Sequence, residues 1–338
     1  MRKLLNKIFR PLFVRLADRY ASAPKREEVF KSLTSLLKSI NEPKDKRGIV
    51  LDINIATDRF IIFSDQHKGN KSRGDDFENN EPNYIAALNY YHAQSYNYIN
   101  LGDAEELWKY KVNQVIPMYK EALQAEAKFQ SVNKYYRTFG NHDLLWKNQL
   151  DVNLYLKPIF PLPLPVYEGL VLRTVVNEIP IQVFLTHGHQ GDKMSDNNAL
   201  STWLVAHIWA PIQRYLGINL NTPANDFYLR DKHNRLMYEW SRRRKNIILI
   251  TGHTHKPVFA SGKYTPAVSN TINVEDTPAN IQPAYFNSGC CCYNDGDITG
   301  IEIADGYIRL IKWKMVDNVS QRHVLEEKEL GKLIQDFN

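Results

Sequence analysis

The chain of 338 residues is 43% hydrophobic and 24% charged, and its only three cysteines are adjacent, at 290–292. This composition is typical of a folded protein and excludes intrinsic disorder, a collagen-like repeat and a disulfide-stapled scaffold. The apolar runs are far shorter than the ~18 residues of a spanning helix, so we expect no transmembrane segment. Unpaired cysteines predict a reducing, cytoplasmic location.

Residues 1–20 carry six Lys or Arg and one acidic residue, and therefore hold five of the six net positive charges of the chain. Their apolar residues recur with a helical period, which predicts an amphipathic helix. This helix either lies on an anionic membrane, at the inner face, or packs on the protein's own core or a second subunit. A second amphipathic helix is predicted over 27–40, and residues 1–48 form a helical N-terminal extension. The nearly neutral remainder offers no broad track for nucleic acid.

From residue 49 the pattern changes to short apolar runs that end in Asp, Asn or His. We expect buried strands near 59–63, 98–101, 136–139, 182–185 and 246–250, with helices near 82–95 and 115–134. This alternation predicts an α/β sheet with ligands beyond the carboxyl ends of the strands. Runs at 283–287, 298–304 and 307–314 predict antiparallel strands that complete a second sheet. The domain then covers 49–320, with a helical cap insertion at 196–243 and a tail at 321–338.

The strand ends supply oxygen and imidazole ligands without a thiolate: Asp65, His67, Asp103, Asn141, His187, His253 and His255. Such ligands suit Mn²⁺, Fe or Zn²⁺. Seven ligands exceed the needs of one ion, so we expect two, bridged by a carboxylate and able to clamp a phosphoryl group. The cysteines are predicted to be structural, because adjacent residues on a strand face opposite ways.

The motifs Asp65-x-His67, Gly102-Asp103, Gly140-Asn141-His142-Asp143, His187-Gly188-His189 and Gly252-His253-Thr254-His255 together resemble the signature of the calcineurin-like metallophosphoesterases. The resemblance covers roughly residues 59–315. It implies a sandwich of two mixed β-sheets flanked by helices, with a dimetal centre for which Mn is the expected metal and Fe or Zn the alternatives. It also implies that Asp65, His67 and His255 hold one metal, that Asn141, His187 and His253 hold the other, and that Asp103 bridges them.

The same resemblance gives His142 the role of stabilising the transition state or protonating the leaving oxygen after attack by a metal-bound hydroxide. Asp143 either orients His142 or turns its loop. His189, Arg73 and Lys256 are candidates for substrate binding, and Lys68 is a further cation beside a motif.

The insertion and the Gly-His-Thr-His-Lys-Pro segment are similar to those of the UDP-2,3-diacylglucosamine pyrophosphatases. This similarity suggests a nucleotide-linked or lipid-associated substrate. A Ser/Thr-type protein phosphatase or a small-molecule phosphomonoesterase is the alternative. The nearly neutral body argues against a nuclease, and the complete ligand set argues against an inactive membrane- or partner-binding protein.

Overall fold

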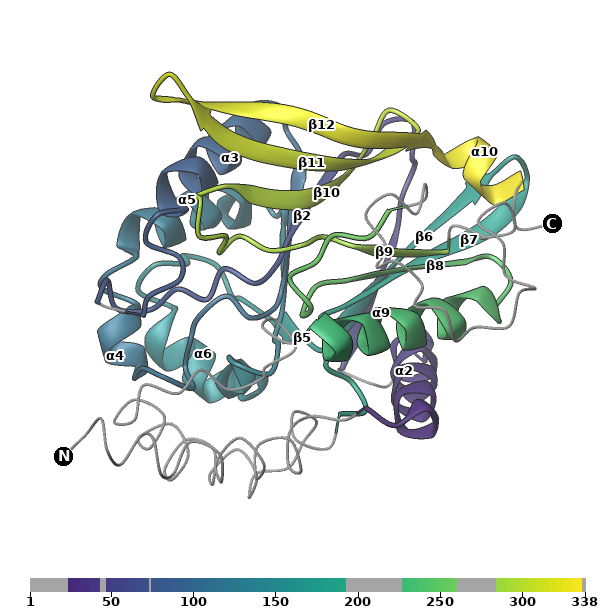
Figure 1. The fold of residues 1–338 in the computed structure, drawn as a ribbon, viewed down its shortest axis with the longest axis horizontal. Helices are drawn as coiled ribbons and strands as arrows, with labels where there is room; N and C mark the ends of the chain where they lie inside the picture. Colours follow the sequence, from purple (N-terminus) through teal and green to yellow (C-terminus); the bar gives the residue numbers. More distant parts are fainter. Residues whose placement is uncertain (1–23, 43–46, 73, 193–226, 260–283, 336–338) are drawn as a thin grey trace.

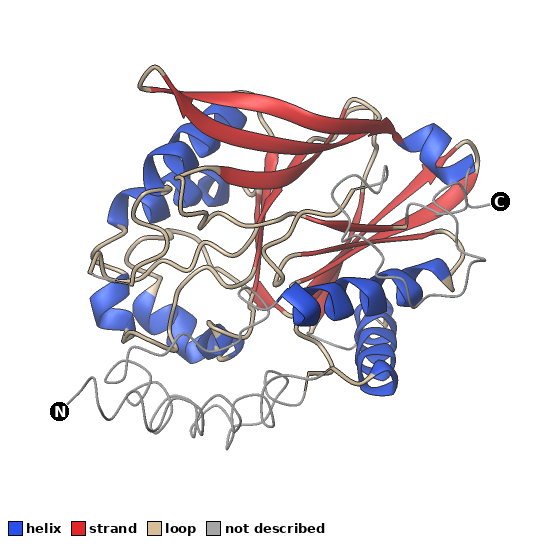
Figure 2. Ribbon diagram, viewed as in Figure 1, coloured by secondary structure: helices blue, strands red, loops and turns tan. Residues whose placement is uncertain are grey.

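The computed structural model describes residues 24–42, 47–72, 74–192, 227–259 and 284–335. Two β-sheets form the centre of the molecule, with helices on their outer sides (Figures 1 and 2). The five-stranded sheet has the order β1 (Gly48–Asp52), β6 (Gly169–Val176), β7 (Ile179–Thr186), β8 (Ile247–Thr251) and β9 (Tyr285–Asn287). The seven-stranded sheet has the order β12 (Val319–Glu329), β11 (Tyr307–Val316), β10 (Ile298–Ala304), β2 (Phe60–Phe63), β3 (Asn97–Leu101), β4 (Tyr135–Thr138) and β5 (Val166–Tyr167).

Both sheets are mixed, as the predicted sandwich requires. Strands β2 to β5 are parallel, and β10 joins β2 antiparallel. In the other sheet, the pairs β1–β6, β7–β8 and β8–β9 are parallel and β6–β7 is antiparallel. The carboxyl ends of β2, β3, β4, β7 and β8 therefore carry the predicted ligand motifs.

Three apolar clusters hold these layers together. Strand β2 shows how, because alternate side chains on a strand face opposite ways. Phe60 and Ile62 pack between the two sheets, whereas Ile61 and Phe63 face the helical layer. That layer contains α3 (Glu81–Ala93), α4 (Val112–Val115), α5 (Lys120–Ser131), a 3₁₀ helix (Leu144–Lys147) and α6 (Gln149–Tyr155).

Helices α2 (Arg26–Asn41) and α9 (Phe227–Arg242) cover the outer face of the five-stranded sheet (Figure 1). Helix α2 confirms the helix predicted at 27–40, and it buries Val29, Leu33 and Leu36 there. Helix α9 is the described part of the predicted cap insertion, and its Trp240 belongs to the same cluster. It therefore forms a layer of the fold. Residues 1–20 and 196–226 lie outside the described residues.

Two expectations for the C-terminal region were wrong. Strand β9 pairs parallel with β8, and β10 and β11 lie in the same sheet as β2, so these three strands do not complete one antiparallel sheet. Residues 319–329, most of which were expected in a tail, form β12 at the sheet edge, followed by α10 (Leu330–Gln335). The charges of β12 made it resemble a tail, although charged residues are common on edge strands. No helix among the described residues has the length and apolar character to cross a membrane.

Candidate metal centre

The predicted ligands lie on tight turns that follow the strands. Five of them have positive φ, in the left-handed region that residues other than glycine rarely adopt. They are Asp65 (54°), His67 (50°), Asp103 (51°), His253 (69°) and His255 (55°). Backbone strain of this kind clusters at functional sites, where the surrounding structure maintains it.

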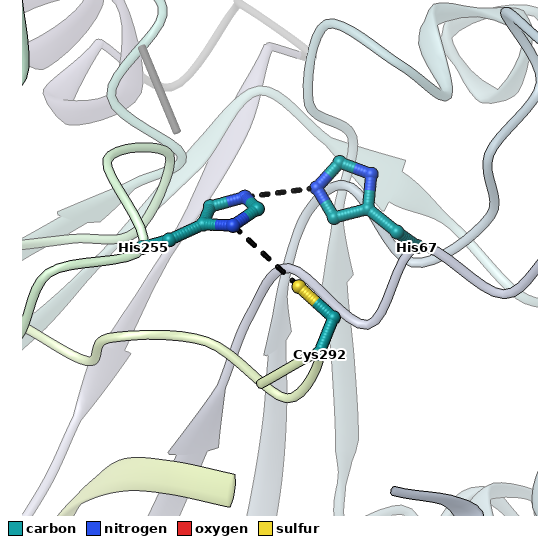
Figure 3. A group of neighbouring side chains, drawn as sticks. All are labelled: His67, His255 and Cys292. Carbon is teal, nitrogen blue, oxygen red and sulfur yellow. Dashed lines mark hydrogen bonds between the residues drawn. The ribbon is translucent and has the colours of Figure 1, made fainter. Parts of the chain in front are cut away.

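Asp65, His67 and His255 form the first group of ligands. Oδ1 of Asp65 lies 3.2 Å from Nε2 of His255 and 3.8 Å from Nε2 of His67. The two Nε2 atoms are 3.0 Å apart and face each other (Figure 3). Two imidazole nitrogens and a carboxylate that converge in this way can hold a divalent cation.

Asp103 lies between this group and a second one. Its Oδ2 is 3.7 Å from Nε2 of His67 and 3.1 Å from Nε2 of His187. His187 Nδ1 is 2.9 Å from the carbonyl oxygen of Leu101, and an N–H donated there leaves the Nε2 lone pair toward Asp103. His253 belongs to the second group, because its ring nitrogen lies within 4.8 Å of the ligand atoms of Asp103 and His187.

Charge at the site also favours a cation. Burial lowers the pKa of His187, but the nearby Asp103 and Asp65 carboxylates have the larger opposite effect, and the pKa is raised to about 9. Burial beside His233 and His187 instead lowers the pKa of His253 well below its usual range, and this favours the neutral, ligating form. The site therefore attracts positive charge, which protons or metal ions can supply.

Buried atoms without partners support a metal. Oδ1 of Asn141 and Nε2 of His253 are buried and have no hydrogen-bond partner. Such atoms are rare in folded proteins and are costly when left unsatisfied. Asn141 lies on the β4 turn beside His142, whose backbone N–H donates to Oδ1 of Asp103 at 2.8 Å. The residues present therefore fit a pair of divalent cations.

His142 is held by a residue that sequence reasoning missed. Its Nδ1 lies 2.8 Å from Oε1 of Glu106, and its ring stacks on Trp108 with centroids 4.0 Å apart. The other Glu106 oxygen is 3.3 Å from Nδ1 of His67. Burial raises the pKa of Glu106, but interactions with His142, His67 and Lys109 lower it well below its usual range. The sequence signal that could have indicated Glu106 is its position three residues after Asp103 of the Gly-Asp motif.

Asp143 holds the loop, which was one of its two expected roles. Its carboxylate accepts backbone N–H groups from Gly140 (2.6 Å), Ala104 (2.9 Å) and Asp103 (3.3 Å). It thus ties the β3 and β4 turns together. The contact with the His142 ring that was considered for Asp143 is made by Glu106 instead, so catalytic contact of Asp143 is not supported by this geometry.

The expected substrate-binding residues differ in their surroundings. His189 is buried, with its ring centroid 5.5 Å from that of His187. Lys256 is half-buried and follows the His255 turn. Arg73 lies outside the described residues. The roles of all three in substrate binding stay predictions.

Lys68 is not a surface cation beside the site. It is fully buried, with Nζ 2.7 Å from Oε1 of Glu126 and 3.6 Å from Oε1 of Glu105. Glu105 also pairs with the buried Arg137, and Tyr135 donates to Glu126. These charges form a buried network next to the predicted metal ligands.

Two further residues near the site were not predicted. Cys292 lies in the loop after β9, with Sγ 3.5 Å from Nδ1 of His255 (Figure 3). The reasoning from alternating strand faces failed because the three cysteines are not on a strand. His233 of α9 is buried with its ring centroid 5.1 Å from that of His253, and burial together with Lys232 lowers its pKa to about 3.

A family model described as calcineurin-like phosphoesterase matches residues 58–257, which is more than half of the chain. The chain belongs to the calcineurin-like phosphoesterase family, and its fold is the two-sheet sandwich expected for that family. Phosphoester hydrolysis and divalent metals are typical of this family, and the described residues contain candidate ligand groups for such metals.

Other comparisons are weaker. No curated protein sequence matches the chain. Solved structures that are similar to this chain include Vacuolar Protein Sorting 29 from Cryptosporidium parvum, with a TM-score of 0.33 and 13% identity over 80% of this chain and 98% of that chain. They also include a single mutant of Vps29 from Entamoeba histolytica, with a TM-score of 0.29 and 13% identity over 79% and 99%. No functional inference follows from similarity at this level.

Proposed function

We propose that this protein is a dinuclear-metal phosphohydrolase. The observation that carries the proposal is the position of Asp103, whose Oδ2 faces both His67 and His187. A carboxylate shared between two ligand groups suits a pair of cations. Asp65, His67 and His255 would hold one cation, and Asn141, His187 and His253 the other, with Mn²⁺ as the proposed metal and Fe or Zn²⁺ as alternatives.

When bound, the two cations lower the pKa of a coordinated water and neutralise charge on the phosphoryl oxygens. His142 donates a proton to the leaving oxygen, because its ring lies beside the ligand atoms of His67 and Asp103 and is still 14% exposed. Glu106 accepts from Nδ1 and orients the ring, while Trp108 stacks on its face. Asp143 holds the turns that carry Asp103 and His142.

The proposed substrate has a phosphoester or pyrophosphate bond and is nucleotide-linked or lipid-associated. This part rests on the insertion between the His187 and His253 motifs and on the amphipathic pattern of residues 1–20. That pattern is the reason to propose contact with an anionic membrane from the cytoplasmic side. The alternative is a phosphomonoesterase, which the same ligand set would serve.

The test uses metal-stripped protein reconstituted with Mn²⁺, Zn²⁺ or Fe²⁺ and assayed on bis-p-nitrophenyl phosphate, p-nitrophenyl phosphate and a UDP-sugar. We expect metal-dependent turnover that Asp103→Ala abolishes. Asp52→Ala, at an exposed carboxylate on β1, is the matched control and should retain full activity. Preference for the diester or pyrophosphate supports the nucleotide-linked substrate, and preference for the monoester supports the alternative. Equal turnover by Asp103→Ala would overturn the proposal.

A further inference from the structure

The His255 ring contacts different partners through its two nitrogens. Nε2 faces Asp65 at 3.2 Å and His67 at 3.0 Å, on the side where a cation is proposed. Nδ1 lies 3.5 Å from Sγ of Cys292, and this sulfur is also within 4.8 Å of a ring nitrogen of His67 (Figure 3). A histidine that ligates a metal through one nitrogen usually donates its other N–H to a carboxylate or carbonyl, and this fixes its tautomer and orientation. Here the neighbour at that position is a thiol.

We propose that Cys292 is a positioning residue of the metal centre. Its sulfur accepts a hydrogen bond from Nδ1–H of His255 and thereby presents the Nε2 lone pair to the cation. The inference rests on the proposed function in one respect, which is that His255 ligates a metal.

The loop that carries Cys292 is fastened to the residues it would serve. The backbone N–H of Cys291 donates to the carbonyl oxygen of Asp65 at 3.1 Å. The hydroxyl of Tyr293 donates to the carbonyl oxygen of His255 at 3.2 Å. Three consecutive residues therefore contact two members of one ligand group, Cys291 through its backbone and Cys292 and Tyr293 through their side chains. This arrangement fixes the sulfur relative to the imidazole.

A thiol also suits the local charge. Asp65 is buried against His255 and His67, and Asp103 and Glu106 are buried against His67. A further carboxylate behind His255 would add a negative charge that is costly to bury. A thiol group, unlike a carboxylate, is uncharged. It can thus select the tautomer without adding charge.

The test compares Cys292→Ser, which keeps a hydrogen-bond acceptor, with Cys292→Val, which keeps the volume and removes the acceptor. Metal affinity is measured by titrating metal-stripped protein with Zn²⁺ and with Mn²⁺ against a chromogenic chelator. We expect Cys292→Val to weaken the binding of one of the two metal ions by about 10- to 100-fold. Cys292→Ser should stay within a few-fold of wild type.

Cys290 interacts with both Cys292 and His255, and Cys291 is buried in the core toward the helices. Cys291→Ala is therefore the inert control and should leave metal affinity unchanged, whereas Cys290→Ala measures what the neighbouring thiol contributes and should weaken metal binding less than Cys292→Val does. Normal metal affinity of Cys292→Val would overturn the inference. So would weaker metal binding by Cys292→Ser alone, because side-chain volume and not the hydrogen-bond acceptor would then decide the affinity. A loss confined to Cys290→Ala would also overturn it.

Cobalt substitution separates a positioning thiol from a metal ligand. The Co²⁺ protein should lack a sulfur-to-cobalt charge-transfer band, because Cys292 contacts His255 and not the ion. A strong band that disappears in Cys292→Val would make Cys292 a direct ligand and would overturn the positioning role. These readouts need no turnover. Suppose that the protein is inactive on every substrate, but that metal affinity is kept in Cys292→Ser and lost in Cys292→Val. This result would support the present inference and would contradict only the proposed function.

Discussion

Oε1 of Glu106 lies 2.8 Å from Nδ1 of His142, and the same carboxylate reaches Nδ1 of His67 at 3.3 Å through its other oxygen. One buried side chain therefore connects the proposed proton donor to a proposed metal ligand. Glu106 lies three residues after Asp103, so the segment after β3 carries both the proposed bridging carboxylate and this connection.

Glu106→Gln should lower kcat by on the order of 10²-fold, because an amide does not hold the imidazolium as the carboxylate does. KM should change little, since Glu106 is not proposed to touch substrate. Steady-state kinetics on bis-p-nitrophenyl phosphate at saturating Mn²⁺ measure the effect. Glu121→Gln, on the exposed face of α5, is the control. Unchanged kcat in Glu106→Gln would remove Glu106 from the mechanism.

Gly140→Ala should disrupt the centre directly. A Cβ at Gly140 would lie 2.7 Å from the backbone nitrogen of Asp103 and would also collide with its carboxylate, so this proposed bridging ligand must move. We expect less than two bound metal ions per chain, measured by elemental analysis after dialysis, and a loss of kcat of at least 10²-fold. Gly331→Ala, whose Cβ would approach no atom closer than 3.5 Å, should bind metal normally.

His142→Asn should separate metal binding from proton transfer. His142 is proposed to act as the acid and not as a ligand, so both ions should remain bound while kcat falls by about 10²- to 10⁴-fold. A substrate with a better leaving group, such as a dinitrophenyl ester, should recover part of the loss because it needs less protonation. A variant that loses metal along with its activity would instead make His142 a ligand.

Glu126→Gln should lower the free energy of unfolding at pH 7 by about 3 kcal/mol, because it leaves the buried Lys68 without its closest partner. Burial raises the pKa of Glu126, but Lys68 and Arg137 lower it below its usual value of 4.5. The carboxylate therefore stabilises the fold above pH 4.5, and this contribution is lost as the pH falls through the lowered pKa.

Urea unfolding at pH 7 and at acidic pH measures this difference, which should shrink between wild type and variant as the pH falls. Glu121→Gln should unfold like wild type at each pH. A gap between Glu126→Gln and wild type that widens toward acid would contradict the assignment.

The sequence predicted which candidate ligands lie together, because they follow buried apolar runs and parallel strands bring their carboxyl ends to one edge. Asp65 after β2 and His187 after β7 illustrate this. Glu106 was missed because a charge beside Glu105 resembles a solvated pair, and only the fold buries both. Cys292 was missed because the path of a loop is not encoded by periodicity. Its contact with His255 depends on Tyr293 and on the backbone of Asp65, far away in sequence.

The fold was predicted well where side chains are buried on both faces and less well at the edges. Strand β2 is apolar throughout and was found, whereas β12 has only half-exposed and exposed residues, most of which were expected in a tail. The partner of β9 was misjudged because an apolar run gives a strand without specifying its neighbour.

The region that resembles the family, 58–257, ends short of the structural unit on both sides. Helix α2 and strand β1 precede it, and β9 to β12 follow it, yet α2 covers Val171 and Phe184 of the five-stranded sheet and β10 covers one side of β2. A fragment of residues 58–257 would keep all seven predicted metal ligands, but it would expose the edges of three strands, β2, β6 and β8, and leave an apolar face uncovered. We expect such a fragment to aggregate, because the segment that matches the family is shorter than the segment that must fold as one unit.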